Sequence, residues 1–150
     1  MSGPGRGLKL VDQPAEEYRL DEQVGFLLRK ANQRHLAIFA RAIPDLTPPQ
    51  FAALAKLAEA GETSQNQLGQ SIAMDAATVK GVIDRLKARG LVELANHESD
   101  RRRLIVSLTA QGREMVEALM ALAREITEET LSPLTPRESA TLARLLAKLG

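Results

Sequence analysis

The sequence predicts a mainly α-helical protein with one small β-hairpin. The chain has 150 residues, the length of a single domain, and 44% of them are apolar but only 3% aromatic. Its core must therefore be built from Leu, Ala, Ile and Val, a composition that favours helices. Apolar residues recur three and four positions apart along most of the chain. Two short apolar runs that flank a polar stretch, within residues 91–108, predict the hairpin.

The first two helices have clear boundaries. Apolar residues at helical spacing predict a helix from Leu20 to Ile43, which Pro44 ends because a residue before proline avoids helical dihedrals. The sequence Thr-Pro-Pro-Gln at 47–50 is a capping box that opens a second helix. That helix should end near Gly61.

Two shorter helices follow in close succession. Residues 64–67, Ser-Gln-Asn-Gln, form another capping box and open a short third helix. Asp75 is a good N-cap for a fourth helix, which should end at Gly90. A short helix, a tight turn and a second helix over residues 64–90 have helix-turn-helix spacing.

The segment after this motif predicts a wing. Leu91–Leu94 and Leu104–Leu108 are the expected strands, and residues 96–103 close a hairpin between them. Thr109 then caps a fifth helix that Pro133 ends, and a capping box at 135–138 opens a sixth.

The predicted organisation is one compact domain with helical extensions. A flexible arm covers residues 1–17, and the winged helix-turn-helix core covers 46–109. Residues 18–45 and 110–150 hold long helices whose apolar stripes exceed what they can bury on each other, so we expect them to form a symmetric homodimer. The alternative is a monomeric bundle packed on the core.

Composition excludes several function classes. The chain has no cysteine and two histidines, which argues against a metal site or a cofactor held by thiolates. It has no Gly-rich phosphate loop and no histidine beside a serine nucleophile, so we do not expect an enzyme. Without an 18-residue apolar run or an apolar signal core at the N-terminus, the expected location is the cytoplasm, with no membrane partner.

Charge segregates along a chain whose formal net charge is only +1. Residues 44–79 hold one Lys against four acids, a net of −3, whereas residues 80–103 hold seven Lys/Arg against four acids, a net of +3. The basic half contains the end of the helix-turn-helix and the wing. Segregated charge of this kind can focus a field on one surface.

With these elements in order, the chain resembles the MarR family of bacterial winged helix-turn-helix regulators. The resemblance covers residues 20–149 and rests on three strings: LTPPQFAALAKLAEAG, SQNQLGQSIAMDAATVKGVIDRLKARGLVEL and SDRRRLIVSLTAQG. It implies a homodimeric repressor of transcription that covers operator DNA. The resemblance also implies that the fourth helix enters the major groove, the wing reaches the minor groove, and the terminal helices form the dimer interface.

The expected DNA contacts come from three elements. The first turns of a recognition helix face base edges, and the start of the preceding helix can bind phosphate. Arg85 can reach phosphate or, as the matching arginine does in the family, help hold the wing. In the wing, Asp100 and Arg102 should project the same way from an extended loop, so that the carboxylate orients an arginine inserted in the minor groove. The predicted DNA-binding residues are Ser64, Gln65, Asn66, Asp75, Ala76, Thr78, Lys80, Arg85, Asp100, Arg101, Arg102 and Arg103.

The first helix is the candidate ligand site. Arg34 and His35 beside Ile38 and Phe39 could bind an aromatic carboxylate, and the string QRHLAIFARAI resembles family members that respond to aromatic acids or aromatic acyl-CoA thioesters. The alternative is an interface histidine with solvated arginines and no small-molecule effector. A further alternative is a winged helix used for protein–protein contacts, although that function needs no minor-groove arginine.

Overall fold

The computed structural model describes residues 17–100 and 102–150. Arg101 and nearly all of the expected N-terminal arm therefore lie outside the described residues. The chain divides into two compact units, one ending at His35 and one covering Leu36–Gly150. Helix α1 (Val24–Ala42) crosses this boundary.

The first expected helix is broken near its start. A short 3-10 helix covers Leu20–Glu22, and Gln23 is extended (φ −83°, ψ 137°) before α1 begins. The prediction of one helix from Leu20 to Ile43 is therefore wrong at its N-terminal end. The side chain of Gln23 donates to the carbonyl of Arg19 (2.9 Å), a local bond that apolar periodicity cannot indicate. At the other end α1 stops at Ala42, as expected from the nearby proline.

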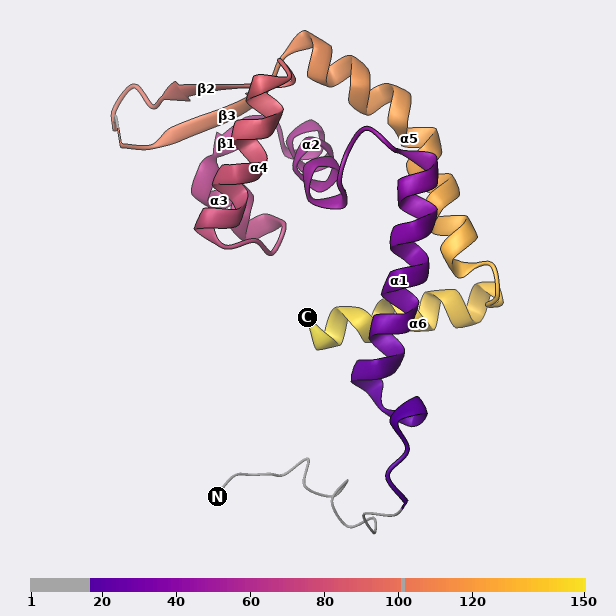
Figure 1. The fold of residues 1–150 in the computed structure, drawn as a ribbon. Helices are drawn as coiled ribbons and strands as arrows, with labels where there is room; N and C mark the ends of the chain where they lie inside the picture. Colours follow the sequence, from indigo (N-terminus) through magenta and orange to yellow (C-terminus); the bar gives the residue numbers. More distant parts are fainter. Residues whose placement is uncertain (1–16, 101) are drawn as a thin grey trace, which may run out of the picture. The chain divides into compact units, whose positions relative to one another are not determined.

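In the second unit, α1 is followed by α2 (Pro48–Ala60; Figure 1). Its predicted capping box is confirmed: the Thr47 hydroxyl accepts from the Gln50 N–H (3.2 Å), and the Thr47 N–H donates to the Gln50 side chain (3.1 Å). The helix ends at Gly61, whose φ of +78° favours glycine.

Helices α3 (Gln65–Ser71) and α4 (Ala76–Ala88) form the predicted helix-turn-helix. Ser64 caps α3 by accepting from the Gln67 N–H (3.2 Å). The reciprocal half of the expected capping box is wrong, because the Gln67 side chain instead accepts from the Thr63 hydroxyl (3.2 Å). Asp75 caps α4 as predicted.

The sheet has three strands rather than the expected two. The hairpin strands β2 (Val92–Asn96) and β3 (Leu104–Leu108) are joined by β1 (Thr63–Ser64), and all pairs are antiparallel in the order β1-β3-β2. Thr63 pairs with Val106 and Ser64 with Ile105, which fixes the start of α3 against the wing. In Figure 1 the β2–β3 hairpin projects beyond α3 and α4.

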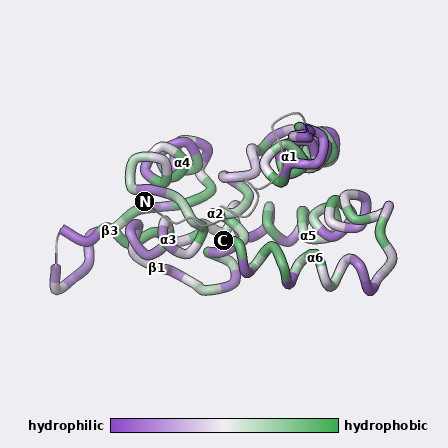
Figure 2. The backbone as a smooth tube through the Cα atoms, turned by 90° about the horizontal axis from the view of Figure 1, so that it is seen from below, coloured by the Kyte–Doolittle hydropathy of each residue, from purple (hydrophilic) through white to green (hydrophobic). Residues whose placement is uncertain are grey.

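Helices α5 (Ala110–Leu131) and α6 (Pro136–Leu149) complete the unit. Thr109 caps α5, and the capping box between Thr135 and Glu138 is confirmed in both directions. The tube of α6 alternates between hydrophobic and hydrophilic stretches in Figure 2. Its leucines at 142, 145, 146 and 149 are 37–71% exposed in this single chain.

The core of the second unit contains buried side chains from α2, α3, α4, β2 and β3. Leu54 from α2, Leu68 from α3, Ile83 and Leu86 from α4 and Val106 from β3 are completely buried. Each fully buried side chain of this size contributes about 1.5–3 kcal/mol to folding. The outer faces of α3, α4 and the wing are therefore presented on a packed scaffold.

Candidate nucleic-acid interface

The N-terminal half of α4 presents a face of small and polar residues. Val79, Val82, Ile83 and Leu86 point into the core, so the predicted contact residues Ala76, Thr78 and Lys80 are all exposed. Asp75 is exposed, but its carboxylate caps the helix. Its Oδ1 accepts from the Thr78 N–H (2.7 Å), and hydrogen bonds from Thr78 lower the pKa of Asp75 below its usual value. Asp75 therefore acts as the N-cap that begins α4.

The start of α3 and the wing residues that lead into β3 share a small polar hollow of about 120 Å³. Strand β1 explains this proximity, because it pairs with β3 directly before α3 begins. Ser64 is 6% exposed and serves as the cap, so it takes the structural role. The hollow brings together six residues, five of them predicted contacts: Ser64, Gln65, Asn66, Arg102, Arg103 and Leu104.

The wing tip is held by a tight turn. The Arg103 N–H donates to the Asp100 carbonyl (3.0 Å), and the Arg102 N–H donates to Asp100 Oδ1 (3.0 Å). Arg102 Nε lies 3.5 Å from the same carboxylate oxygen, while the Arg102 side chain is 95% exposed. The expected contact between Asp100 and Arg102 is confirmed. The prediction of an extended loop is wrong, because the two residues meet through hydrogen bonds of the Asp100 side chain within a turn.

A second side chain organises the same turn, and the sequence did not indicate it. His97 Nδ1 accepts from the Ser99 N–H (3.1 Å) and lies 2.8 Å from the Ser99 hydroxyl oxygen. The backbone N–H of His97 also donates to the Arg103 carbonyl (2.9 Å), which closes the hairpin end. The signal that could have found it is the His-x-Ser spacing before Asp100.

Arg85 takes a position on α4 rather than against the wing. A Cβ added to Gly81 would lie 3.3 Å from Arg85 Nη1, so the guanidinium sits beside the helix surface at this glycine. Both residues line an open groove between α4 and the start of α2, together with Pro49 and Gln50. Because the Asp100 carboxylate pairs with Arg102, this geometry favours phosphate contact over wing support for Arg85.

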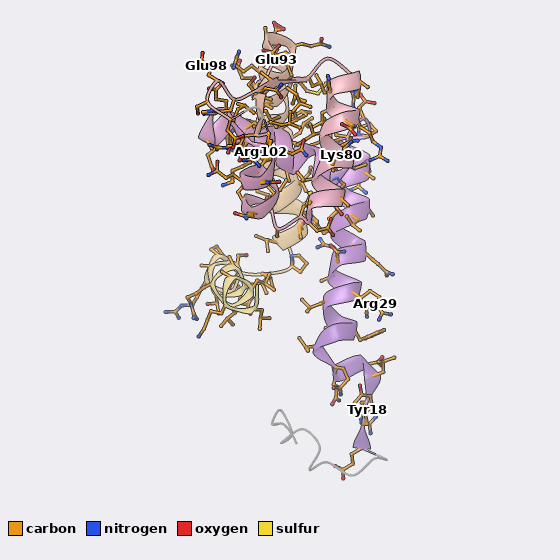
Figure 3. All side chains as sticks on the ribbon, turned by 90° about the vertical axis from the view of Figure 1, so that its left-hand side faces the viewer. Tyr18, Arg29, Lys80, Glu93, Glu98 and Arg102 are labelled. Carbon is orange, nitrogen blue, oxygen red and sulfur yellow. The ribbon has the colours of Figure 1, made fainter. Side chains whose placement is uncertain are left out.

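Lys80 is paired within its own helix. Its Nζ lies 2.8 Å from Asp84 Oδ2, and both side chains are more than half exposed. Lys80 on α4 and Arg102 on the wing are labelled in Figure 3, where they extend from separate elements of the second unit. In the sequence, Asp84 is one of the four acids within residues 80–103, and no motif indicates a role for it.

The four predicted ligand residues do not form one described pocket. Ile38 and Phe39 are 4% and 5% exposed and belong to the core, where Phe39 packs edge-on against Phe51. Arg34 and His35 lie in the first unit, on the other side of the boundary within α1. The structure thus gives Ile38 and Phe39 a packing role.

The second unit has a separate hollow that does not involve the four predicted ligand residues. It lies between α2 and α5, has a volume of about 560 Å³ and is lined mainly by apolar side chains. Arg113 is a cation at this hollow, and Glu59 and Glu117 are carboxylates. Glu59 accepts from Lys56 (2.8 Å), and this hydrogen bond and the lysine charge lower the pKa of Glu59. An apolar cavity with few polar groups is typical of small-molecule sites.

Within residues 17–100 and 102–150, no group of His, Asp and Glu side chains is arranged to hold a metal ion. In the same residues, every helix is too short or too polar to cross a membrane.

Comparison with known proteins decides the family. A family model described as MarR family matches residues 45–103, which include α2, the helix-turn-helix and most of the wing. The transcriptional repressor NicR of Pseudomonas putida is 43% identical over 134 residues, 88% of this chain and 85% of its own length. The chain belongs to the MarR family.

Solved structures agree with this assignment. A Pseudomonas aeruginosa structure is 53% identical and covers 88% of this chain and 100% of its own, with a TM-score of 0.84. BpsR of Bordetella bronchiseptica, solved to explain regulation of its DNA binding by 6-hydroxynicotinic acid, is 44% identical. It covers 88% of this chain and 96% of its own, with a TM-score of 0.85. This MarR-family chain is a DNA-binding transcriptional regulator and not an enzyme.

Proposed function

We propose that this regulator is a homodimeric repressor that places α4 in the major groove of its operator and the wing in the adjacent minor groove. The observation that carries the proposal is the wing turn. Arg102 is almost fully exposed, yet its Nε is held 3.5 Å from the Asp100 carboxylate. An arginine oriented in this way loses less entropy when it enters a narrow minor groove, whose negative potential attracts it.

The remaining contacts follow from the same placement. Ala76 and Thr78 are exposed where the first turn of α4 would meet base edges. Asn66, Gln65 and Arg103 line the hollow beside α3 and suit a DNA phosphate. From the sequence, Arg101 is proposed to make a further contact with the phosphate backbone of the DNA.

The test compares Arg102→Ala with Arg137→Ala, an equal loss of charge at an exposed position on α6. The operator is first obtained by selecting bound duplexes from a random pool. Arg102→Ala should weaken operator binding about tenfold or more, as expected for a specific arginine contact. Equal affinities for the two variants would remove Arg102 from the interface.

The homodimer is proposed from the apolar face of α6. Leucines that are 37–71% exposed in one chain would be buried against a second copy, as would apolar residues of the 18–45 segment. Sedimentation of a dimer at micromolar concentration is expected. A monomer at that concentration would support the alternative of a self-contained bundle.

We further propose that a hydroxylated aromatic carboxylate releases the repressor from DNA. BpsR, the relative regulated by 6-hydroxynicotinic acid, supports this class of ligand. Two cationic positions are candidates for its carboxylate: Arg113 at the α2–α5 hollow, and the Arg34–His35 pair predicted from the sequence. One alternative is that the ligand is an aromatic acyl-CoA. The second alternative is that the regulator has no small-molecule effector.

Calorimetry with 6-hydroxynicotinic acid tests the ligand class, and 6-hydroxynicotinamide is the matched compound without the carboxylate. Binding of the acid alone, weakened in Arg113→Met or in Arg34→Met, would identify the recognising cation. If neither the acid nor aromatic acyl-CoA thioesters give a heat of binding, regulation without an effector is favoured. The proposed place of action is the bacterial nucleoid, where the operator lies.

Protein–protein contact remains the second candidate use of the wing. Steep salt dependence of DNA binding distinguishes the two, because each phosphate neutralised changes the logarithmic slope by about −0.9.

A further inference from the structure

Asp84 occupies the centre of the α4 face that points away from the core. Successive residues of an α-helix are separated by 100°, so Ala77, Gly81 and Asp84 form one line opposite the buried Val79 and Leu86. The side chain of Asp84 is 52% exposed. An acidic residue therefore lies one turn beyond Lys80, on the side of α4 that is proposed to face polyanionic DNA.

The stability of α4 does not explain this aspartate. Lys80 precedes Asp84, and an ion pair in this order supports a helix less than one in which the acid precedes the lysine. Aspartate is also among the weaker helix formers. The helix already has a capping bond from Asp75 and four buried apolar side chains.

We propose that Asp84 is a specificity-determining residue for operator recognition, which rests on the proposed placement of α4 in the major groove. Off the operator, its carboxylate holds Lys80 at 2.8 Å and cancels the charge that Lys80 would offer to any phosphate. On the operator, the carboxylate accepts a hydrogen bond from the exocyclic amino group of a cytosine or an adenine.

The chemistry of the two partners supports this selectivity. An ionised carboxylate accepts hydrogen bonds and donates none. In the major groove, cytosine N4 and adenine N6 are donors, whereas guanine presents two acceptors and thymine presents one acceptor and a methyl group. Asp84 is therefore repelled by guanine O6 and N7, thymine O4 and phosphate oxygens, which disfavours wrong sequences and non-specific DNA.

The experiment selects duplexes from a random pool in parallel with wild type, Asp84→Ala and Glu59→Ala. Glu59 is a matched control because it pairs with Lys56 at 2.8 Å, and its removal changes the net charge equally on a different helix. The operator and a shuffled duplex are then titrated at several salt concentrations.

For Asp84→Ala, we expect the motif to lose its preference for C or A at one position of each half-site. The mismatch penalty there should fall from about tenfold toward unity. Affinity for the shuffled duplex should rise about two- to fivefold, the range of one exposed ion pair, and its salt slope should steepen by about 0.9 as Lys80 gains a phosphate. Asp84→Asn should shift the preference toward adenine, which an amide pairs with in bidentate fashion.

The outcomes separate the inference from the function on which it rests. Identical motifs and equal shuffled-DNA affinities for Asp84→Ala and Glu59→Ala would overturn the role of Asp84. That result would leave the placement of α4 intact if Lys80→Ala still weakens operator binding. If Lys80→Ala also binds normally, the placement of α4 itself is wrong.

Discussion

Replacing Gly112 with alanine should destabilise the joint between the wing and α5. A Cβ built on Gly112 would lie 2.1 Å from the carbonyl oxygen of Leu91 and 3.3 Å from Leu108 Cδ2. The oxygen belongs to the backbone, so the clash cannot be relieved by rotating a side chain. The first turn of α5 would have to move away from the start of the hairpin.

The magnitude follows from what that movement would break. Overpacking of this kind costs about 1–3 kcal/mol. Two hydrogen bonds link Thr109 to the start of the hairpin. Its N–H donates to the Leu91 carbonyl (3.1 Å), and its hydroxyl donates to the Gly90 carbonyl (2.7 Å). Weakening them costs about 1 kcal/mol each, while alanine returns about 1 kcal/mol of helix propensity. The net loss is about 2–4 kcal/mol, or a Tm lower by about 4–16 °C for a chain of this size.

Thermal unfolding at one fixed protein concentration measures this loss, since the stability of a dimer depends on concentration. Gly25→Ala is the control, because a Cβ at Gly25 in α1 meets no atom within 4 Å. We expect that variant to be as stable as wild type or slightly more so. If Gly112→Ala unfolds at the same temperature as Gly25→Ala, the argument from close approach is refuted.

Three further predictions concern the caps and the dimer. Hydrogen bonds from Thr78 lower the pKa of Asp75, so its ionised form stabilises α4 at neutral pH, and that stability is lost as pH falls below about 4. The dependence of unfolding stability on acid pH should be weaker in Asp75→Asn, which keeps a cap without the charge. A pH profile equal to that of wild type would contradict this. Thr135→Ala should lose about 1 kcal/mol of capping in α6 and speed its amide exchange, whereas Thr135→Ser should not. Leu145→Lys should shift sedimentation from dimer to monomer, and a persistent dimer would place the interface elsewhere.

Features that depend on a few neighbouring residues were predictable from the sequence. The capping boxes at Thr47 and Thr135 and the cap at Asp75 form as expected, because each uses bonds within one turn of chain. The helix-turn-helix and the hairpin followed from these boundaries. The residues of α4 that are proposed to face DNA were then the ones left outside its buried stripe.

Features that depend on distant partners were not predictable. Strand β1 has two residues and exists because Thr63 and Ser64 pair with β3, more than 40 positions later. The same pairing brings the α3 start to the wing, so the polar hollow at Gln65 and Arg102 has no signal in the local sequence. Apolar character at Ile38 and Phe39 fitted a ligand pocket and a core equally well, and burial in the core is what the fold produces.

The wing shows that a correct contact can be inferred from the wrong conformation. A spacing of two residues places side chains on one side of an extended strand, and it also suits a turn in which an aspartate accepts from the backbone two residues on. Asp100 takes the second arrangement, so one carboxylate oxygen both fixes the Arg102 backbone and lies beside its guanidinium. The orientation of the Arg102 side chain therefore depends on the conformation of the turn, which the backbone hydrogen bond between His97 and Arg103 closes. The orientation of the arginine proposed to enter the minor groove therefore depends on the loop backbone as well as on the ion pair.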